Sequence, residues 1–280
     1  MASRSGTGLG LKSEERRILM NPLTTAALGA LAIGLAAAPA LAQEGPDPQS
    51  LASFAPMETQ DALVVPTGTL EFQNYAYYQD NPNSKSGPSI LELSPTIKIG
   101  AFHHVQLDVT APYTIYGHGT NGGTFGFDGY YQFTDPTPTM PALAVQAGYT
   151  ATSYGPGQTS KSYFGRALFT QWLGPDSHAP RLDLNINWTH YADPPPGTRS
   201  DVFGFGIGYT RRLNDKLAFV SDIVHDYLPT NYQAENFVDA GFRYVIGGGW
   251  VVSEVVGAGF AQNSPAFRSI FVFQKDFQAF

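Results

Sequence analysis

The chain has 280 residues, of which 42% are hydrophobic and only 14% are charged, against about 25% charged in an ordinary globular protein. Because the chain has no cysteine, disulfide scaffolds, thiolate catalysis and cysteine-ligated metal centres are excluded. Its net charge of −7 gives no basic surface, so nucleic acids are not expected as partners. The 30 glycines and 21 prolines indicate a turn-rich chain rather than a bundle of helices.

The first 42 residues have the pattern of a secretory signal peptide. Four basic residues, the last of them Arg17, precede an apolar run over residues 23–41 that ends in the small-residue sequence Ala-Leu-Ala at Ala42. We predict export and cleavage after Ala42, which leaves a product of net charge −9, because the removed segment holds four basic and two acidic residues. Two alternatives stay open: the run is a membrane anchor, or Met20 is the true initiator.

Residues 43–66 form a polar lead with four prolines and no clear period. We expect an N-terminal tail in the periplasm, from where it can plug or gate the rest of the protein from below.

From residue 67 onward the chain is a regular succession of segments rich in Val, Ile, Phe and Tyr, separated by clusters of Gly, Pro, Asn and Asp. These signals predict twelve strands, at residues 68–79, 89–100, 103–114, 124–134, 141–152, 161–173, 181–192, 201–213, 216–227, 235–246, 250–261 and 266–277. Such segments exceed the 5 to 6 residues of an average strand and reach the roughly 9 to 11 that a tilted strand needs to cross a bilayer.

Apolar and polar residues alternate along most of the segments. In the second segment Leu91, Leu93, Ile97 and Ile99 alternate with Glu92, Ser94, Thr96 and Lys98, so that one face is apolar. The alternation is unclear in residues 163–173 and in residues 251–261, where Glu254 lies among apolar neighbours of its own parity. A soluble sandwich produces the same alternation, so other features must place the apolar face.

Three features favour an apolar face turned to lipid. Short connections, such as Asn214-Asp215, alternate with longer ones, such as residues 193–200, as in outer-membrane barrels. Aromatic residues gather near segment ends, where interfacial girdles would lie. The last segment is aromatic, and Phe280 resembles an assembly signal, although Phe277 is the residue that keeps the strand's parity.

If the apolar faces point to lipid, a polar set points inward. Acids outnumber bases in it, and further inward residues include Gln132, Gln146 and Gln274. Two interpretations stay open: the inward charges line a lumen that guides a permeant, or they pair with one another and fill a closed barrel. The lumen-lining candidates are Glu71, Tyr75, Glu92, Lys98, Asp108, Asp128, Tyr130, Arg166, Asp183, Asp222, Asp239, Arg243 and Arg268.

The sequence contains few motifs that are typical of enzymes. No nucleophile elbow, zinc-protease helix or phosphate loop occurs, and we expect neither catalysis nor a cofactor nor a metal. The pair His103-His104 falls on a tight turn and is interpreted as a solvated turn rather than as a ligand pair. Because no helix follows them, Gly204, Gly206 and Gly208 are interpreted as small inward residues of a strand, not as a dinucleotide fingerprint.

Four stretches resemble outer-membrane proteins of the family named for the meta-cleavage pathway of phenol degradation. They are Val65-Pro66-Thr67-Gly68-Thr69-Leu70-Glu71, residues 93–100, the hairpin from Phe205 to Phe219, and residues 239–244 with Ser264-Pro265. The resemblance covers about residues 62 to 280 and departs from the pattern after Phe277. It implies transport of small aromatic or hydrophobic compounds and supplies no catalytic residues.

The sequence therefore predicts a transmembrane antiparallel β-barrel of about twelve strands over residues 67–280, in the bacterial outer membrane, with both ends in the periplasm. The expected function is passive uptake of small molecules, with aromatic or hydrophobic compounds as the candidate class. Expected partners are outer-membrane lipid, the permeant and the barrel assembly machinery. A structural or adhesion barrel without a pathway and an outer-membrane hydrolase remain the alternatives.

Overall fold

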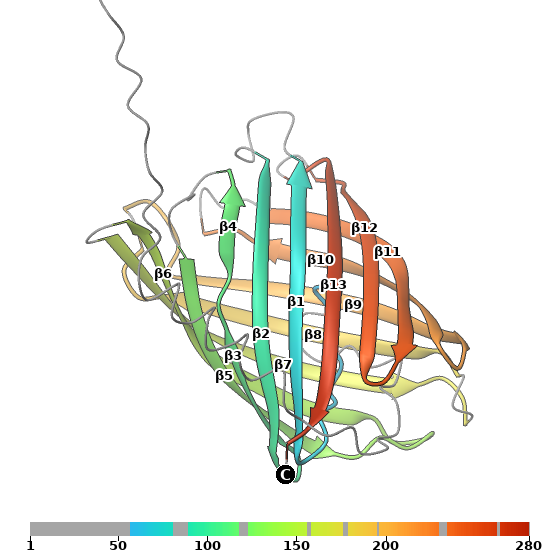
Figure 1. Ribbon diagram of the computed structural model, residues 1–280. Coiled ribbons are helices and arrows are strands. Elements are labelled where there is room, and N and C mark those ends of the chain that lie inside the picture. The colour runs from blue at the N-terminus through green and yellow to red at the C-terminus, as the bar shows by residue number, and fades with distance from the viewer. Residues whose placement is uncertain are drawn as a thin grey trace, which may run out of the picture. The chain divides into compact units, whose positions relative to one another are not determined.

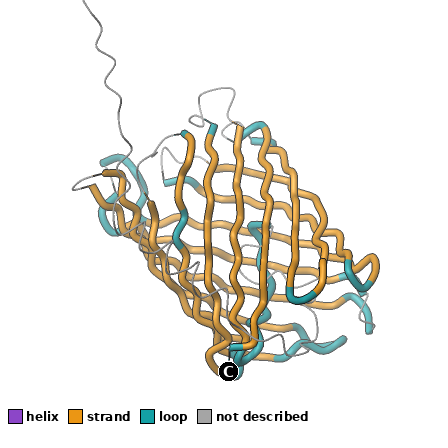
Figure 2. The backbone as a smooth tube through the Cα atoms, viewed as in Figure 1, coloured by secondary structure: helices purple, strands orange, loops and turns teal. Residues whose placement is uncertain are grey.

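The computed structural model describes residues 57–80, 89–117, 123–155, 158–175, 179–194, 196–229, 234–261 and 264–279. These residues form one closed antiparallel β-barrel (Figure 1 and Figure 2). Its strands are β1 (Thr69–Asp80), β2 (Ile90–Phe102), β3 (Val105–Thr110), β4 (Tyr113–Tyr116), β5 (Gly123–Thr134), β6 (Ala142–Gly155), β7 (Gln158–Trp172), β8 (Arg181–Tyr191), β9 (Asp201–Asn214), β10 (Leu217–Tyr227), β11 (Ala234–Gly247), β12 (Trp250–Gly259) and β13 (Phe267–Gln278).

The barrel closes because β1 pairs with β13 along its whole length, from Thr69 opposite Gln278 to Asp80 opposite Phe267. Both β3 and β4 pair with β2 and with β5, so they are two parts of one wall strand and the described wall has twelve. The break falls at Pro112, which has no N–H to give to the ladder. The predicted fold class is confirmed, and full closure leaves no unpaired sheet edge in a bilayer.

Side chains alternate between a polar interior and an apolar exterior. Along β9, Phe203, Phe205 and Ile207 are 49%, 45% and 55% exposed, whereas Thr210 on the opposite face is fully buried. The period of two in a strand sends successive side chains to opposite faces, and an outer face of large apolar residues suits lipid. The unclear parity of β12 is settled by the structure, because Glu254 is exposed on the outer face and lies opposite Phe242 and Phe271.

The end of the barrel that holds Thr69 and Gln278 is called the base here. The connections of β2 to β3, β9 to β10 and β11 to β12 are tight turns at the base, as predicted. Two other base connections are longer, at residues 135–141 and 173–180, and β6 and β7 are joined by only two residues at the opposite end. The alternation of short and long connections therefore holds only in part.

Two predicted regions lie beyond this description. The predicted signal peptide and residues 43–56 of the predicted tail lie outside the described residues. The remaining part of that tail, residues 57–66, lies inside the barrel and is called the strap here; Figure 2 shows its loop trace within the ring of strands.

Among the described residues, no helix has the length and hydropathy needed to cross a bilayer.

Candidate functional site in the barrel lumen

The strap is as deeply buried as a protein core. Met57, Thr59, Gln60, Asp61 and Ala62 are each at most 2% exposed. At its C-terminal end the chain turns into β1 through Gly68, whose φ of 81° is a conformation that glycine adopts readily. A Cβ on Gly100 of β2 would lie 2.1 Å from the Pro66 carbonyl oxygen, so only glycine at that position lets the strap pass.

The strap has no partner strand, and side chains of the wall bind its backbone instead. Five strap N–H groups donate to five inward acceptors on five different strands. The pairs are Thr59 N to Asp222 Oδ2 (3.0 Å), Gln60 N to Asn185 Oδ1 (2.6 Å), Ala62 N to Thr170 Oγ1 (2.8 Å), Val64 N to Gln132 Oε1 (3.1 Å) and Val65 N to Gln106 Oε1 (2.7 Å). These bonds answer the requirement that a buried backbone donor be satisfied.

Two strap carbonyl groups are bound in the same way. Asn185 Nδ2 donates to the Gln60 carbonyl oxygen at 2.8 Å, so one side chain pairs with both polar groups of one strap residue. The Tyr130 hydroxyl donates to the Asp61 carbonyl oxygen. Most of these contacts involve backbone atoms of the strap, so they depend little on which side chains the strap carries.

Two strap carboxylates meet arginines of the wall. Asp61 Oδ2 lies 3.2 Å from Arg181 Nη1 with both side chains fully buried, and Arg181 Nε also contacts Asp183 at 3.1 Å. Glu58 lies 3.1 Å from Arg268, which also pairs with Asp239. Each arginine therefore has one carboxylate from the wall and one from the strap, and it keeps a partner if the strap leaves.

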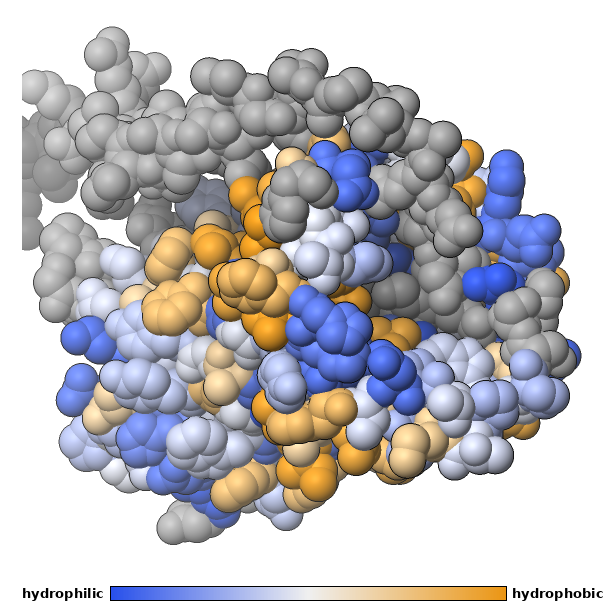
Figure 3. All heavy atoms as spheres, turned by 90° about the horizontal axis from the view of Figure 1, so that it is seen from below, coloured by the Kyte–Doolittle hydropathy of each residue, from blue (hydrophilic) through white to orange (hydrophobic). Residues whose placement is uncertain are grey.

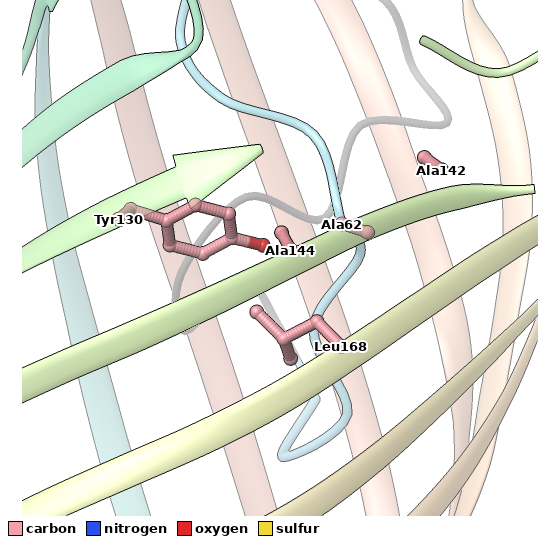
Figure 4. Close-up of a cluster of buried hydrophobic side chains, with 5 residues drawn as sticks. All are labelled: Ala62, Tyr130, Ala142, Ala144 and Leu168. Carbon is pink, nitrogen blue, oxygen red and sulfur yellow. The ribbon is translucent and has the colours of Figure 1, made fainter. Parts of the chain in front are cut away.

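Apolar contacts fill the space that remains. Ala62 packs against Tyr130, Ala142, Ala144 and Leu168, which come from β5, β6 and β7 (Figure 4). Seen from the base, atoms of hydrophilic and hydrophobic residues fill the middle of the molecule (Figure 3). The lumen is therefore occupied in this conformation.

A second group of inward side chains binds its own neighbours instead of the strap. Lys98 Nζ lies 2.6 Å from Glu71, and Gln274 donates to Glu71 at 2.6 Å and to Asp276 at 2.8 Å. Arg243 Nη2 donates to Gln274 at 2.6 Å. These five residues, on β1, β2, β11 and β13, are called the lateral network here.

The structure places all thirteen predicted lumen residues on the inner face. Ten are buried, and Tyr75, Glu92 and Arg166 are half-buried. Tyr130, Asp222 and Arg268 contact the strap, whereas Glu71, Lys98 and Arg243 belong to the lateral network. The others contact wall groups; for instance, Asp128 accepts from Gln146 at 2.7 Å and Asp108 from Gln106 at 2.9 Å.

The candidate set omits several residues that hold the strap, among them Gln106, Thr170, Arg181 and Asn185. Thr170 falls in a segment whose parity is unclear from the sequence, and Arg181 is the first residue of its strand. One signal points to the missing partner: a Cβ on Gly206 would lie 2.5 Å from Thr59 Oγ1, and one on Gly208 would lie 3.0 Å from Thr59 Cγ2. Alternate inward glycines on β9 thus make room for a second chain segment.

A hydrolase would need a serine or other nucleophile within reach of a histidine. In the part of the chain that the structure describes, the histidines with hydrogen bonds contact Asp135, Asp201 and Asn236, and none contacts a hydroxyl group. Ser200 donates to Asp201 rather than to His190. His118 and His178 lie outside the described residues.

No family model and no curated protein matches the sequence. Among solved structures, an outer-membrane channel from Pseudomonas putida F1 is similar over 79% of this chain and 100% of its own, at 11% identity and a TM-score of 0.55. The KdgM porin is similar over 73% of this chain and 98% of its own, at 8% identity and a TM-score of 0.51. At such identities the likeness is one of fold: this chain has the twelve-stranded barrel architecture of outer-membrane channels.

Proposed function

We propose that this protein is a passive outer-membrane channel for small molecules, which the strap closes from the base. The observation that carries the proposal is the polar lumen occupied by a segment of the chain that no wall strand pairs with. A segment held by side-chain contacts can leave without breaking the ladder of the barrel, because none of the strand pairs includes a strap residue. The outer face, with its large exposed apolar residues, would contact membrane lipid, and the base would face the periplasm.

The proposed permeants are small aromatic or hydrophobic compounds. The resemblance to the phenol-degradation family supports this class, and inward tyrosines at positions 75, 77 and 130 offer aromatic surfaces beside charged groups. Such a lumen can orient a ring with a polar substituent through hydrogen bonds and stacking. Export by the signal peptide and insertion by the barrel assembly machinery belong to the same proposal.

The absence of cysteine permits a direct test of the gate. Thr59 Cβ lies 3.5 Å from the position of a Cβ on Gly206, which falls within the roughly 3.5 to 4.5 Å of a disulfide. In the double variant Thr59→Cys/Gly206→Cys, we expect low solute flux into proteoliposomes after oxidation and a severalfold rise after reduction. The two single-cysteine variants serve as controls that do not respond to reduction.

Solute choice is tested with the same vesicles. A phenol-like compound and a sugar are compared in the natural protein and in a variant that lacks residues 57–66, and we expect the variant to be faster for both and the aromatic compound to be preferred. If neither solute exceeds the flux of empty liposomes in either form, the channel proposal fails and the structural barrel becomes the better reading. Heat-modifiable migration in gel electrophoresis verifies that each variant is folded.

A further inference from the structure

Two connections at the base bring a histidine pair and a carboxylate together. His103 and His104 form the turn between β2 and β3, and Asp135 follows β5. Because β3 pairs with β5, the two connections are neighbours, and Gln132 N donates to the His104 carbonyl oxygen at 3.0 Å. None of these three side chains touches the strap or the lateral network in the interactions described above.

We propose that His103, His104 and Asp135 form a binding site for a divalent transition-metal ion. His104 Nε2 lies 2.9 Å from Asp135 Oδ1, and one ligand atom from each of the three residues lies within 4.8 Å of the others. Two ligands with bonds of about 2.1 Å to one metal are about 3.0 Å apart at right angles and about 3.4 Å apart in a tetrahedron, so the first pair needs only a small movement. The imidazole rings of His103 and His104 are stacked, with centroids 3.8 Å apart, so the His103 ring must rotate out of the stack to direct a nitrogen at the same ion.

The carboxylate is already oriented by a neighbour. Gln132 Nε2 donates to Asp135 Oδ1 at 3.2 Å and to the Thr134 carbonyl oxygen at 3.1 Å, which fixes the amide beside the proposed ligand. Hydrogen bonds of this kind to ligating carboxylates are typical of metal sites. Binding of a metal to His104 Nε2 replaces the hydrogen bond between His104 and Asp135, and the neutral imidazole then carries its proton on Nδ1.

The backbone of the turn is compatible with a histidine at position 104. His104 has a φ of 65°, in the left-handed region where glycine and asparagine are the preferred turn residues. Histidine adopts this region more often than most residues with a Cβ, so the backbone conformation by itself does not indicate a ligand. The contact of the His104 ring with the Asp135 carboxylate is the observation that indicates a metal ligand.

The ligand types select the metal. Two imidazole nitrogens and one carboxylate oxygen suit Zn²⁺, Ni²⁺ or Cu²⁺, and they do not suit Ca²⁺ or Mg²⁺, which prefer oxygen ligands. The Asp135 side chain is 69% exposed and that of His104 is 19% exposed. The remaining coordination positions therefore face water, and the site is open to ions from the aqueous side of the base.

A matched control exists in the same chain. His190 Nδ1 lies 3.0 Å from Asp201 Oδ1, again at an exposed position, but this pair has no third metal-ligating side chain beside it among the described residues. If a histidine and an aspartate alone were enough to bind a metal ion, both pairs would bind one.

The experiment titrates Ni²⁺, Zn²⁺ or Cu²⁺ into the untagged full-length protein in detergent by calorimetry. We expect one ion per chain and a weakening of roughly tenfold or more in His103→Ala, His104→Ala and Asp135→Asn, with no change in His190→Ala. Nitrogen hyperfine splitting in the Cu²⁺ electron paramagnetic resonance spectrum reports two imidazoles. No binding, or an equal loss in His190→Ala, overturns the proposal. His103→Ala keeps the test valid if His104→Ala fails to fold, because His103 is exposed and only its ring contacts His104 in the interactions described.

Discussion

The inner wall of the barrel has two polar regions that use their polar groups differently. The strap-binding region, on β3, β5, β7, β8 and β10, directs amides, hydroxyls and carboxylates to the backbone of residues 59–65. The lateral network, on β1, β2, β11 and β13, pairs its charged groups with one another. The inward polar groups of one barrel therefore have two kinds of partner, the strap and other groups of the wall, and the two kinds occupy different parts of the wall.

The difference teaches that burial and charge alone do not identify a permeation path. Lys98 and Asp183 are both fully buried on the inner wall. Lys98 contacts a neighbouring strand of the wall, whereas Asp183 shares Arg181 with the strap, which no strand pairs with. What separates them is whether the partner belongs to the strand ladder, and that is a property of the topology.

The largest effect is expected in the lateral network. Lys98→Met removes the cation from a buried ion pair and leaves Glu71 with an uncompensated charge, which costs about 3 to 5 kcal/mol. Denaturant unfolding in lipid vesicles measures the loss. The double variant Lys98→Met/Glu71→Gln should recover most of it, and equal instability of the single and double variants would contradict an ion-pair origin.

Substitutions in the strap-binding region should change solute flux rather than the stability of the barrel. Asn185→Leu removes two hydrogen bonds to Gln60 and weakens docking of the strap by about 1 to 3 kcal/mol, or roughly tenfold in the ratio of closed to open channels. Solute flux should rise while the unfolding midpoint of the barrel changes little.

The matched control is Asn74→Leu, because Asn74 lies on the opposite face of β1 and makes no strap contact in the described hydrogen bonds. If both variants raise the flux, or if Asn185→Leu unfolds the barrel, the distinction between the two regions is wrong.

A substitution on the outer face is expected to raise the stability of the barrel rather than lower it. Glu254 is exposed in the middle of β12 between Phe242 and Phe271, where a charge faces lipid. Glu254→Leu should stabilise the barrel in bilayers by roughly 1 to 2 kcal/mol, less than the cost of a basic residue at the same depth. Denaturant unfolding in lipid vesicles measures this gain in stability. A loss of stability would contradict the prediction and would show that the Glu254 carboxylate makes a stabilising contact in the native barrel.

The smallest effect concerns ion selectivity once the strap is gone. The buried wall carries six carboxylates, Glu71, Asp108, Asp128, Asp183, Asp222 and Asp239, and four cations, Lys98, Arg181, Arg243 and Arg268. A variant that lacks residues 57–66 should therefore prefer potassium to chloride modestly, and the preference should weaken at high salt. Reversal potentials in planar bilayers measure it, and anion preference would show that the acids do not set the field.

The sequence by itself determined the architecture and the face of most side chains. Strand length and a period of two are local properties, so Leu91 to Ile99 on one face and Glu92 to Lys98 on the other could be assigned without any contact being known. Twelve wall strands and the inward direction of residues such as Asp128 and Arg243 follow from that pattern. Only where both faces are apolar, as around Glu254, did the pattern fail.

Only the tertiary structure decided which inward groups meet. Residues 57–66 have no period because they form no ladder, and hence their position in the lumen has no local signature beyond the glycines of β9. Gln106, Thr170 and Asn185 lie far apart in sequence and converge on the strap because the closed wall surrounds it. His104 meets Asp135 for a similar reason, since the pairing of β3 with β5 joins two turns that the chain separates. Contacts between distant segments depend on which strands pair and, for the strap, on closure of the whole sheet, and no window of sequence contains either.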